Sequence, residues 1–175
     1  MPIKSRIRTV PDFPKKGIMF RDVTALIADP LGLKLCVDDF ARYYKDTDID
    51  LIVGIDSRGF ILGAALAYVL QKGFVPVRKK GKLPAETVSE DYELEYGTDT
   101  LEIHHDAVAK KQKVLIIDDL IATGGTAVAA INLVKKLGGD IVGFAAVVNL
   151  PDIGGSKKIA ETGVAVYAQT EFEGD

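Results

Sequence analysis

The sequence is poor in the residues that build disulfide frameworks and metal centres. Its 175 residues include one cysteine, Cys36, and two histidines, His104 and His105. A single cysteine excludes an internal disulfide framework and is typical of a reducing compartment. One cysteine and two histidines are also too few ligands for a structural zinc site.

Long apolar runs and a strong charge of one sign are also missing. No run approaches the roughly 20 apolar residues that a membrane-spanning helix needs. The first residues, MPIKSRIR, lack the apolar core of a secretion signal, so we expect a cytoplasmic protein. Because this segment is basic and amphipathic, an organelle signal is the alternative. The formal net charge of −3 gives no basic surface for nucleic acid, so we expect neither a nucleic-acid nor a membrane partner.

What is present is an alternation of two kinds of apolar segment. Short aliphatic runs typical of buried strands occur at residues 51–55, 74–77, 114–117 and 141–148. Between them, residues 59–71 and 127–137 have helical composition. This order predicts an α/β fold: an open, mostly parallel sheet flanked by helices, with right-handed crossovers. A length of 175 residues suits one domain.

The two ends of the chain depart from this alternation. Residues 1–30 are punctuated by proline, and the C-terminal segment, 151–175, carries a short predicted strand at 164–168. We expect both ends to form a small hood above the carboxyl edge of the sheet, where ligands of open α/β sheets bind.

A middle segment is also different. Residues 86–96 and 100–104 are β-rich, charged and joined through Gly97, which predicts a hairpin that projects from the sheet. We therefore expect a single domain made of a hood (1–30), a core (31–150) with a flexible loop (84–104), and a C-terminal segment (151–175).

The most informative segment is residues 114–126, VLIIDDLIATGGT. Its four aliphatic residues predict a strand buried on both faces, and Asp118 and Asp119 follow where that strand should end. A turn of small residues then leads into the predicted helix. Glycine lets backbone N–H groups at a helix start approach an anion closely, and threonine hydroxyls can donate as well. The turn therefore predicts a phosphate seat, made of Ala122, Thr123, Gly124, Gly125 and Thr126.

The two aspartates suit the same ligand. Carboxylates only accept hydrogen bonds, so Asp118 and Asp119 suit sugar hydroxyls or a metal bridged through the ligand. Together with the phosphate seat, they predict a ribose 5-phosphate moiety as the ligand.

Two other interpretations of this segment compete. Aliphatic residues followed by two aspartates also resemble the metal-binding strand of a nucleoside triphosphatase, which needs a partner loop of Gly, four residues and Gly-Lys-Ser/Thr. No segment has that spacing, and Gly154-Gly155-Ser156-Lys157 departs from it. The second alternative is a buried strand with a solvated acidic turn. It is less favoured because adjacent like charges repel and need a positive partner.

Four further motifs accompany this segment in a fixed order. They are PDFP at 11–14 with GIMFRD at 17–22, GIDSRGF at 54–60, RKKGKLP at 78–84 and YELEYG at 92–97. In order and spacing they resemble the adenine phosphoribosyltransferases, a branch of the type I phosphoribosyltransferase family, over nearly the whole chain.

That resemblance implies an activity. The substrates would be adenine and 5-phosphoribosyl 1-diphosphate (PRPP), and the products AMP and diphosphate, as in purine salvage. The cofactor would be Mg²⁺, bound with PRPP and not directly by the protein. The resemblance also implies a homodimer.

The resemblance further assigns residues to the parts of PRPP. Asp118 and Asp119 would bind the ribose hydroxyls and stabilise the positive ring that develops during displacement. The diphosphate would be held by main-chain N–H groups of Asp56, Ser57 and Arg58, across an unusual cis peptide, and Arg58 would help to stabilise it as it leaves.

A cationic segment supplies more candidates for the diphosphate. Residues 78–82 contain four cations, directly after a predicted strand, in a chain that is acidic overall. A charge run is usually a solvated face, but at a strand's carboxyl end it can hold a leaving group and offset its growing charge. By resemblance, the PRPP contacts are Arg78, Lys79 and Lys82, with Lys80 a weaker candidate.

Residues 90–100 resemble the mobile loop that closes over the site in this family, which would exclude water from the reacting sugar. Within this loop, Glu95 aligns with the family's proposed general acid/base, which handles a purine ring proton. Tyr96, beside it, is a candidate PRPP contact. The residues alone do not distinguish Glu95 from the other acids at positions 90, 91, 93 and 102.

The base pocket is assigned to Met19, Phe20 and Arg21, mostly by resemblance. Phe20 would stack on the purine, and main-chain groups of Met19 and Arg21 would pair with its edge. Such pairing prefers a 6-amino purine, because donor and acceptor are exchanged in a 6-oxo purine.

Two rival functions remain. One is another purine phosphoribosyltransferase, such as one for xanthine. The other is a regulator that senses PRPP without catalysis. A regulator of that kind needs a nucleic-acid-binding surface, and the composition provides none.

Overall fold

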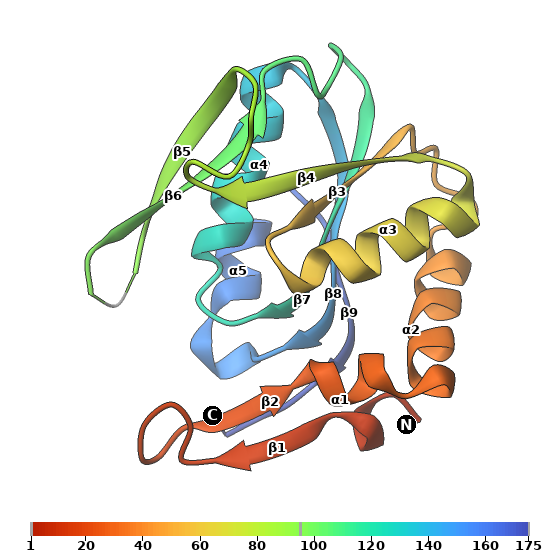
Figure 1. The fold of residues 1–175 in the computed structure, drawn as a ribbon. Coiled ribbons are helices and arrows are strands. Elements are labelled where there is room, and N and C mark those ends of the chain that lie inside the picture. Colours follow the sequence, from red (N-terminus) through yellow and green to blue (C-terminus); the bar gives the residue numbers. More distant parts are fainter. Residues whose placement is uncertain (1, 95, 175) are drawn as a thin grey trace.

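A seven-stranded sheet runs through the centre of the protein, with helices against both of its faces (Figure 1). The structure is a computed structural model and describes residues 2–94 and 96–174. The strand order is β5-β6-β4-β3-β7-β8-β9. Its parallel strands are β4 (Gly73–Lys79), β3 (Leu51–Ile55), β7 (Lys113–Ile121), β8 (Asp140–Asn149) and β9 (Val166–Glu171). The predicted α/β fold with an open, mostly parallel sheet is confirmed.

Two parallel strands extend beyond the aliphatic runs that predicted them. β7 continues through Asp118 and Asp119 to Ile121, since its pairing with β8 continues to that residue. β4 likewise includes Arg78 and Lys79, which pair with β6. The prediction that these charged residues follow the strand ends is therefore wrong. Hydrogen bonds with a neighbouring strand decide where a strand ends, and the local pattern does not encode them.

The longer helices connect or cover these strands. α3 (Arg58–Leu70) links β3 to β4, and α4 (Gly125–Leu137) links β7 to β8. α2 (Pro30–Tyr43) begins after Asp29, whose side chain accepts the N–H of Leu31, and proline fits its first position. The short helices are α1 (Val23–Ala28), α5 (Gly155–Ala160), η1 (Lys4–Arg6) and η2 (Pro151–Ile153). Across the described ranges, no helix has both the length and the apolar character required to cross a membrane.

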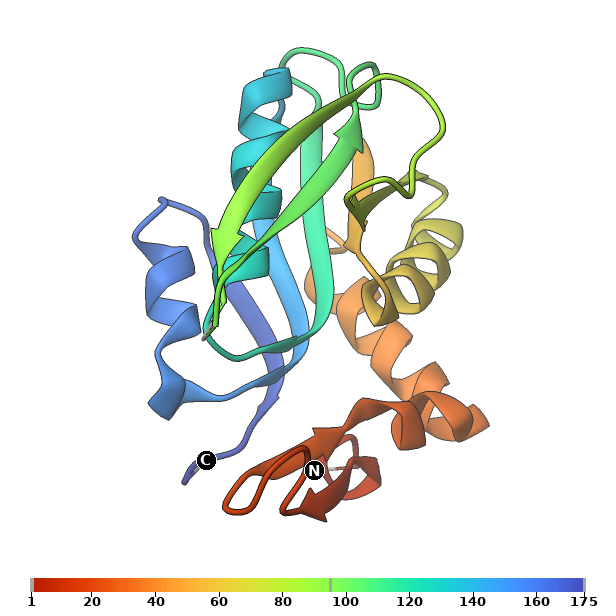
Figure 2. The ribbon, with the colours of Figure 1, turned by 60° about the vertical axis from the view of Figure 1, so that its left-hand side comes forward.

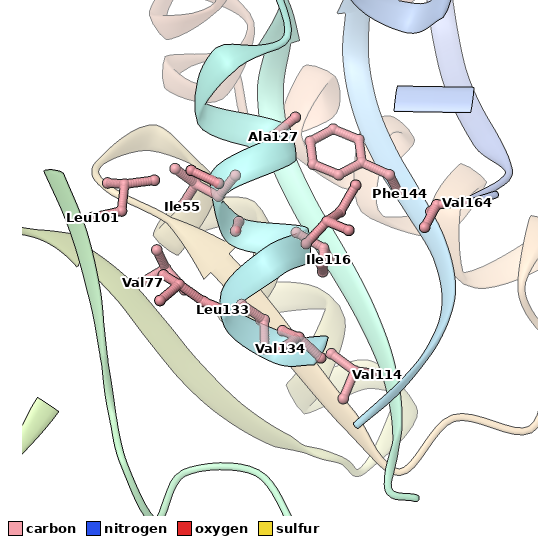
Figure 3. Close-up of a cluster of buried hydrophobic side chains, with 14 of the residues drawn as sticks. Ile55, Val77, Leu101, Val114, Ile116, Ala127, Leu133, Val134, Phe144 and Val164 are labelled. Carbon is pink, nitrogen blue, oxygen red and sulfur yellow. The ribbon is translucent and has the colours of Figure 1, made fainter. Parts of the chain in front are cut away.

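Alternate residues of the strands supply two hydrophobic clusters, one on each face of the sheet. In β7, Val114 and Ile116 belong to the first cluster, which packs against α4 (Figure 3). Leu115 and Ile117 belong to the second cluster, which includes residues of α1, α2 and α3. The predicted burial of this strand on both faces is confirmed. Because β7 is held on both faces, the segment that follows it is held at the carboxyl edge of the sheet.

The predicted hairpin is also confirmed. It consists of β5 (Thr87–Glu93) and β6 (Thr98–His104), paired antiparallel along their whole length. β6 joins the edge strand of the parallel sheet through two residue pairs, and the rest of the hairpin extends past β4 (Figure 1). Glu90 binds it to α4 by accepting a hydrogen bond from Asn132 at 2.9 Å and by pairing with Lys136.

The N-terminal segment forms the hood. β1 (Arg8–Pro11) and β2 (Met19–Asp22) make a two-stranded sheet below the carboxyl ends of β7 and β8 (Figures 1 and 2). The expectation that the C-terminal segment also forms the hood is wrong for Val166–Glu171, because this strand, β9, pairs with β8 in the main sheet. The C-terminal segment contacts the hood where Lys4 Nζ donates to the Glu171 carbonyl at 2.6 Å and where Arg21 lies over the Phe172 ring.

Candidate active site

The predicted phosphate seat is a backbone loop between β7 and α4. Gly124 has a left-handed φ of 79°, and its carbonyl accepts the N–H of Val128 at 2.9 Å. The helix therefore begins at Gly125 and not at Ala127 as predicted. Loop residues share a cleft of about 120 Å³ with Tyr92, Glu93 and Leu94 of the hairpin. Free N–H groups of a helix start beside a cleft can bind an anion.

The two aspartates lie at the end of β7, just before this loop. Asp118 is 8% exposed and Asp119 is 6% exposed. One oxygen of Asp118 accepts the backbone N–H of Asp119 at 2.9 Å. Burial, and then the neighbouring charge of Asp119, hold the pKa of Asp118 well above its usual value.

The positive partner that such a pair requires is Arg58. Its Nε donates to a carboxylate oxygen of Asp119, across 61 positions of sequence. Burial tends to lower the pKa of Arg58, but the hydrogen bond and charge of Asp119 outweigh it and leave the pKa raised. The Arg58 side chain is 43% exposed, so it neutralises Asp119 while part of it still faces solvent.

This electrostatic arrangement predicts a gain of stability for Asp118→Asn. The asparagine oxygen can still accept the Asp119 N–H, and the buried like charge is removed. We expect a stabilisation of about 1 kcal/mol, the usual size of a gain from relieving an unfavourable charge, and a thermal midpoint raised by about 2–4 °C. Calorimetric melting of both proteins measures it.

The pH dependence gives this prediction its sign. The folded-state pKa of Asp118 is raised, so the wild type loses stability as pH rises above the unfolded value near 3.8, until the raised pKa is passed. The advantage of Asp118→Asn should thus vanish at low pH and grow towards neutrality. The exposed Asp46→Asn change is the control. An advantage that shrinks with rising pH would contradict the assignment.

The loop after β3 has the backbone that the resemblance implied. The peptide bond between Asp56 and Ser57 is cis. The Asp56 N–H donates to the Val77 carbonyl at 2.9 Å. Its carboxylate turns towards β4, 3.5 Å from Arg78 Nε and 3.4 Å from the N–H of Lys79. The structure therefore brings two of the predicted diphosphate segments together.

The predicted cations do not all face the same way. Lys79 Nζ is bound to the carboxylate of Asp99 and to the Tyr92 hydroxyl, both from the hairpin. Burial tends to lower the pKa of Lys79, but the bonds to Asp99 and Tyr92 outweigh it and raise the pKa. Arg78 Nη1 donates to the Lys82 carbonyl at 3.3 Å. The side chains of Lys80 and Lys82 are exposed.

A second, more apolar cleft of about 420 Å³ lies between the hood and the start of α3. Its lining residues come from the hood, from α1 and from the first residue of α3: Val10, Phe13, Phe20, Asp22, Thr24 and Arg58. The Phe13 and Phe20 rings meet edge to face, with centroids 5.1 Å apart. Because Arg58 reaches both this cleft and Asp119, the cleft adjoins the acidic pair.

The tip of the hairpin approaches the hood. Tyr96 is 80% exposed, and Lys15 Nζ lies 5.3 Å from its ring centroid. Glu95, the predicted acid/base, lies outside the described residues. Its neighbours Glu93 and Leu94 line the cleft at the phosphate loop, which places this part of the hairpin at the candidate site.

Comparison with known proteins agrees with this geometry. The chain matches the phosphoribosyl transferase domain family over residues 22–165. Adenine phosphoribosyltransferase of Chlorobaculum tepidum is 65% identical over 177 aligned positions that cover all of both chains. The chain belongs to the adenine phosphoribosyltransferase family. Its members are pentosyl-transferring enzymes, so this protein is a glycosyltransferase.

Solved structures of adenine phosphoribosyltransferases share the whole fold. The enzyme of Thermoanaerobacter pseudethanolicus has a TM-score of 0.93 at 48% identity, with 98% of each chain covered. The Saccharomyces cerevisiae enzyme has a TM-score of 0.91 at 38% identity, with 97% of each chain covered. That structure is a complex with adenine and D-2,5-dideoxy-2,5-imino-altritol 1,6-bisphosphate.

Resemblance to the adenine phosphoribosyltransferases selected Phe20 for the base pocket and missed other lining residues. Val10 pairs with Phe20 in the β1–β2 register, so both side chains lie on one face of the hood. Phe13 stands in the PDFP motif and could have been recognised as a second aromatic wall. Met19 and Arg21 do not line the cleft; the Arg21 side chain instead donates to Thr9 Oγ1 at 2.8 Å.

Asp22 was also missed as a lining residue. Its carboxylate caps α1 by accepting the N–H of Thr24 at 3.0 Å and is held by Arg8 at 2.6 Å. Hydrogen bonds from the Thr24 hydroxyl and from Arg8 lower the pKa of Asp22. The cleft thus contains a fixed carboxylate, which the Asp-Val-Thr sequence at a helix start could have indicated.

Proposed function

We propose that this protein transfers the 5-phosphoribosyl group of PRPP to adenine and releases AMP and diphosphate. The observation that carries the proposal is the continuity of the site. The phosphate loop follows the end of β7, two residues after Asp119; Asp119 binds Arg58, and Arg58 lines the aromatic cleft. One edge of the sheet therefore offers adjacent surfaces for a phosphate, a sugar and a flat apolar base.

The proposed roles follow from these surfaces. Backbone N–H groups and hydroxyls of residues 122–126 bind the 5-phosphate at the start of α4. Asp118 and Asp119 accept hydrogen bonds from the ribose hydroxyls and favour the positive charge that develops on the ring. The leaving diphosphate meets main-chain N–H groups at Asp56 and Ser57, as well as Arg58 and the cations Arg78, Lys79 and Lys82.

Magnesium is part of this proposal as a companion of PRPP. Diphosphate oxygens are ligands that Mg²⁺ prefers, and the carboxylates of Asp118 and Asp119 lie near the same edge of the sheet. The site fits the ion without a dedicated protein cage. When bound, Mg²⁺ would offset the charge of the leaving group.

The base is proposed to stack on Phe20 and to be read by the main chain of Met19 and Arg21. The supporting observation is that Met19 and Arg21 flank Phe20 in β2, so their main chain lies next to the proposed stacking surface. Glu95 is proposed to handle the purine ring proton, with Tyr96 beside it. Closure of the hairpin would exclude water from the reaction.

The test is product formation from a panel of purines with PRPP and Mg²⁺. Adenine should give AMP with release of diphosphate, and 6-oxo purines should give little product. Good turnover of xanthine or guanine with failure on adenine would favour the rival transferase. Binding of PRPP without diphosphate release would favour the non-catalytic regulator.

We further propose a homodimer in the cytoplasm. The exposed apolar side chains of α3 support the dimer, because Ile61, Tyr68 and Val69 are 46%, 87% and 48% exposed. Side chains of this kind are often covered in an interface. Sedimentation of the purified protein distinguishes a dimer from a monomer.

The contact between Lys79 and Asp99 leads to a further prediction. If Lys79 binds diphosphate, the Asp99 carboxylate competes with the substrate for the same ammonium group. We expect Asp99→Asn to lower the KM for PRPP roughly two- to fivefold, the range of partly exposed charge pairs. Steady-state kinetics at varied PRPP measure the change.

Asp91→Asn is the matched control, because Asp91 accepts a hydrogen bond from Thr100 Oγ1 in the same hairpin. Its KM for PRPP should match that of the wild type. A higher KM in Asp99→Asn would mean that Asp99 orients Lys79 for the substrate and does not compete with it.

A further inference from the structure

The first residue of α5, Gly155, contacts the backbone of the phosphate loop. The N–H of Gly155 donates to the carbonyl of Ala122 at 3.0 Å. Next to it, the Leu150 N–H donates to the Ile121 carbonyl at 3.0 Å. The segment 150–155 therefore continues the backbone contacts of β8 beyond the sheet and along the loop.

Gly155 and the loop touch backbone to backbone. A Cβ on Gly155 would lie 2.7 Å from the Gly124 nitrogen and 2.9 Å from the Ala122 carbonyl carbon, and closer still to the Ala122 oxygen. A Cβ on Gly124 would in turn lie 2.8 Å from the Gly155 oxygen. These neighbours are main-chain atoms, so they cannot move aside as the end of a side chain can. A side chain at position 155 must displace the loop or α5.

α5 is the less movable of the two. Ile159, on the same helix, is fully buried in the first hydrophobic cluster. The loop ends at a cleft and has open space on that side. A methyl group at position 155 would therefore push the loop towards the space where the phosphate binds.

We propose that Gly155 is a positioning residue for the phosphate seat: it sets the place of the N–H groups of Ala122–Gly125 through direct backbone contact. The inference rests on the proposed function, in which this loop binds the terminal phosphoryl group of ribose 5-phosphate. Gly155 itself touches the loop and not the ligand.

The test is binding of ribose 5-phosphate to Gly155→Ala, measured by calorimetry. We expect affinity to fall at least about tenfold, because small displacements of positioned groups have large effects. Adenine affinity should stay within about twofold, as for changes that touch no ligand. Loss of helix propensity cannot explain the result, since alanine is favoured over glycine in a helix.

Gly163→Ala is the matched control at the other end of the same segment. Gly163 has a φ of 85°, so alanine is strained there, and its Cβ would meet nothing within 4 Å. Strain without contact to the loop should leave ribose 5-phosphate binding unchanged. The proposal is overturned if Gly155→Ala binds ribose 5-phosphate like the wild type, or if it loses adenine and ribose 5-phosphate equally.

A second measurement needs no variant and applies if Gly155→Ala does not fold. Ribose 5-phosphate bound to the wild type should slow hydrogen exchange of the Gly155 N–H at least about threefold, because it stabilises the acceptor loop. The Gly163 N–H, which donates to Ala160 at 2.9 Å, should not change. Equal exchange at Gly155 with and without the ligand would overturn the proposal.

Diphosphate release and ribose 5-phosphate binding distinguish a failure of the proposed function from a failure of the positioning role. A wild type that binds ribose 5-phosphate but releases no diphosphate from PRPP and adenine would refute the transferase, while the comparison of variants still decides the role of Gly155. A wild type that does not bind ribose 5-phosphate would overturn the positioning role, whatever the protein catalyses.

Discussion

Asp119→Ala is expected to lower kcat/KM for PRPP at least about 100-fold, the usual effect of removing one preorganised group that stabilises developing charge. The variant loses a ribose acceptor and the negative charge beside the reacting ring. It also frees Arg58, which in the wild type donates to Asp119. Initial rates at varied PRPP and saturating adenine measure the loss.

The fold should survive this change. Asp119 sits beside Asp118, so its removal relieves a buried like-charge repulsion, and the melting midpoint should not fall. Asp46→Ala, at a side chain that is 89% exposed, is the control and should have wild-type kinetics. Near-normal turnover in Asp119→Ala would refute the ribose assignment.

Glu95→Gln is expected to lower kcat by about 10²–10⁴-fold, the contribution of a positioned general acid or base. The choice of Glu95 stays a prediction, and the described acids of the hairpin can be compared with it. Glu90 is paired with Lys136, and hydrogen bonds from it lower the pKa of Glu90. Asp91 accepts from Thr100, and buried Glu102 accepts the Gly81 N–H at 3.0 Å. These three carboxylates already have partners away from the aromatic cleft.

Glu93→Gln is the informative comparison, because Glu93 is exposed and lines the cleft at the phosphate loop. Its kcat should stay much closer to that of the wild type. Rates across the pH range extend the test, since loss of the acid/base should remove one limb of the profile. The reverse order, with Glu93→Gln severely impaired and Glu95→Gln active, would transfer the role to Glu93.

The acidic pair shows why such a site costs stability. Two adjacent carboxylates are buried, and burial and the charge of Asp119 raise the pKa of Asp118, which the charge of Arg58 only partly offsets. A protein selected for stability alone would not keep both charges. The predicted gain in Asp118→Asn and the predicted loss of activity in Asp119→Ala are two consequences of the same arrangement.

Local features of the site could be predicted from the sequence. The segment 114–126 carries its own signals: aliphatic residues for a buried strand, glycines for a turn with a positive φ, and helical spacing afterwards. Each signal acts over a few neighbouring residues, so the strand, turn and helix were found with errors at their ends. The alternation of strands and helices likewise predicted a parallel sheet whose carboxyl edge collects the loops.

Contacts between distant segments could not be predicted in this way. The need for a positive partner was evident from Asp118 and Asp119, but its identity as Arg58 depends on β3 and β7 being neighbours in the sheet. The same holds for Lys79. The motif predicts that it contacts the diphosphate, but in the structure its ammonium group binds Asp99 of the hairpin. Strand order selects these partners, and strand order follows from packing of the whole chain.

The sequence by itself therefore determined the family, the class of fold and the kinds of residue at the site, because these depend on local periodicity and on motifs in a fixed order. The tertiary structure alone decided which charges meet, that Phe13 faces Phe20, and that Gly155 supports the phosphate loop. The contacts of Arg58 with Asp119 and of Gly155 with Ala122 join segments far apart in the chain, whereas the Phe13–Phe20 contact depends on how the β1–β2 hairpin folds back. Their geometry depends on how closely the elements pack, and a local pattern of residue types carries no such information.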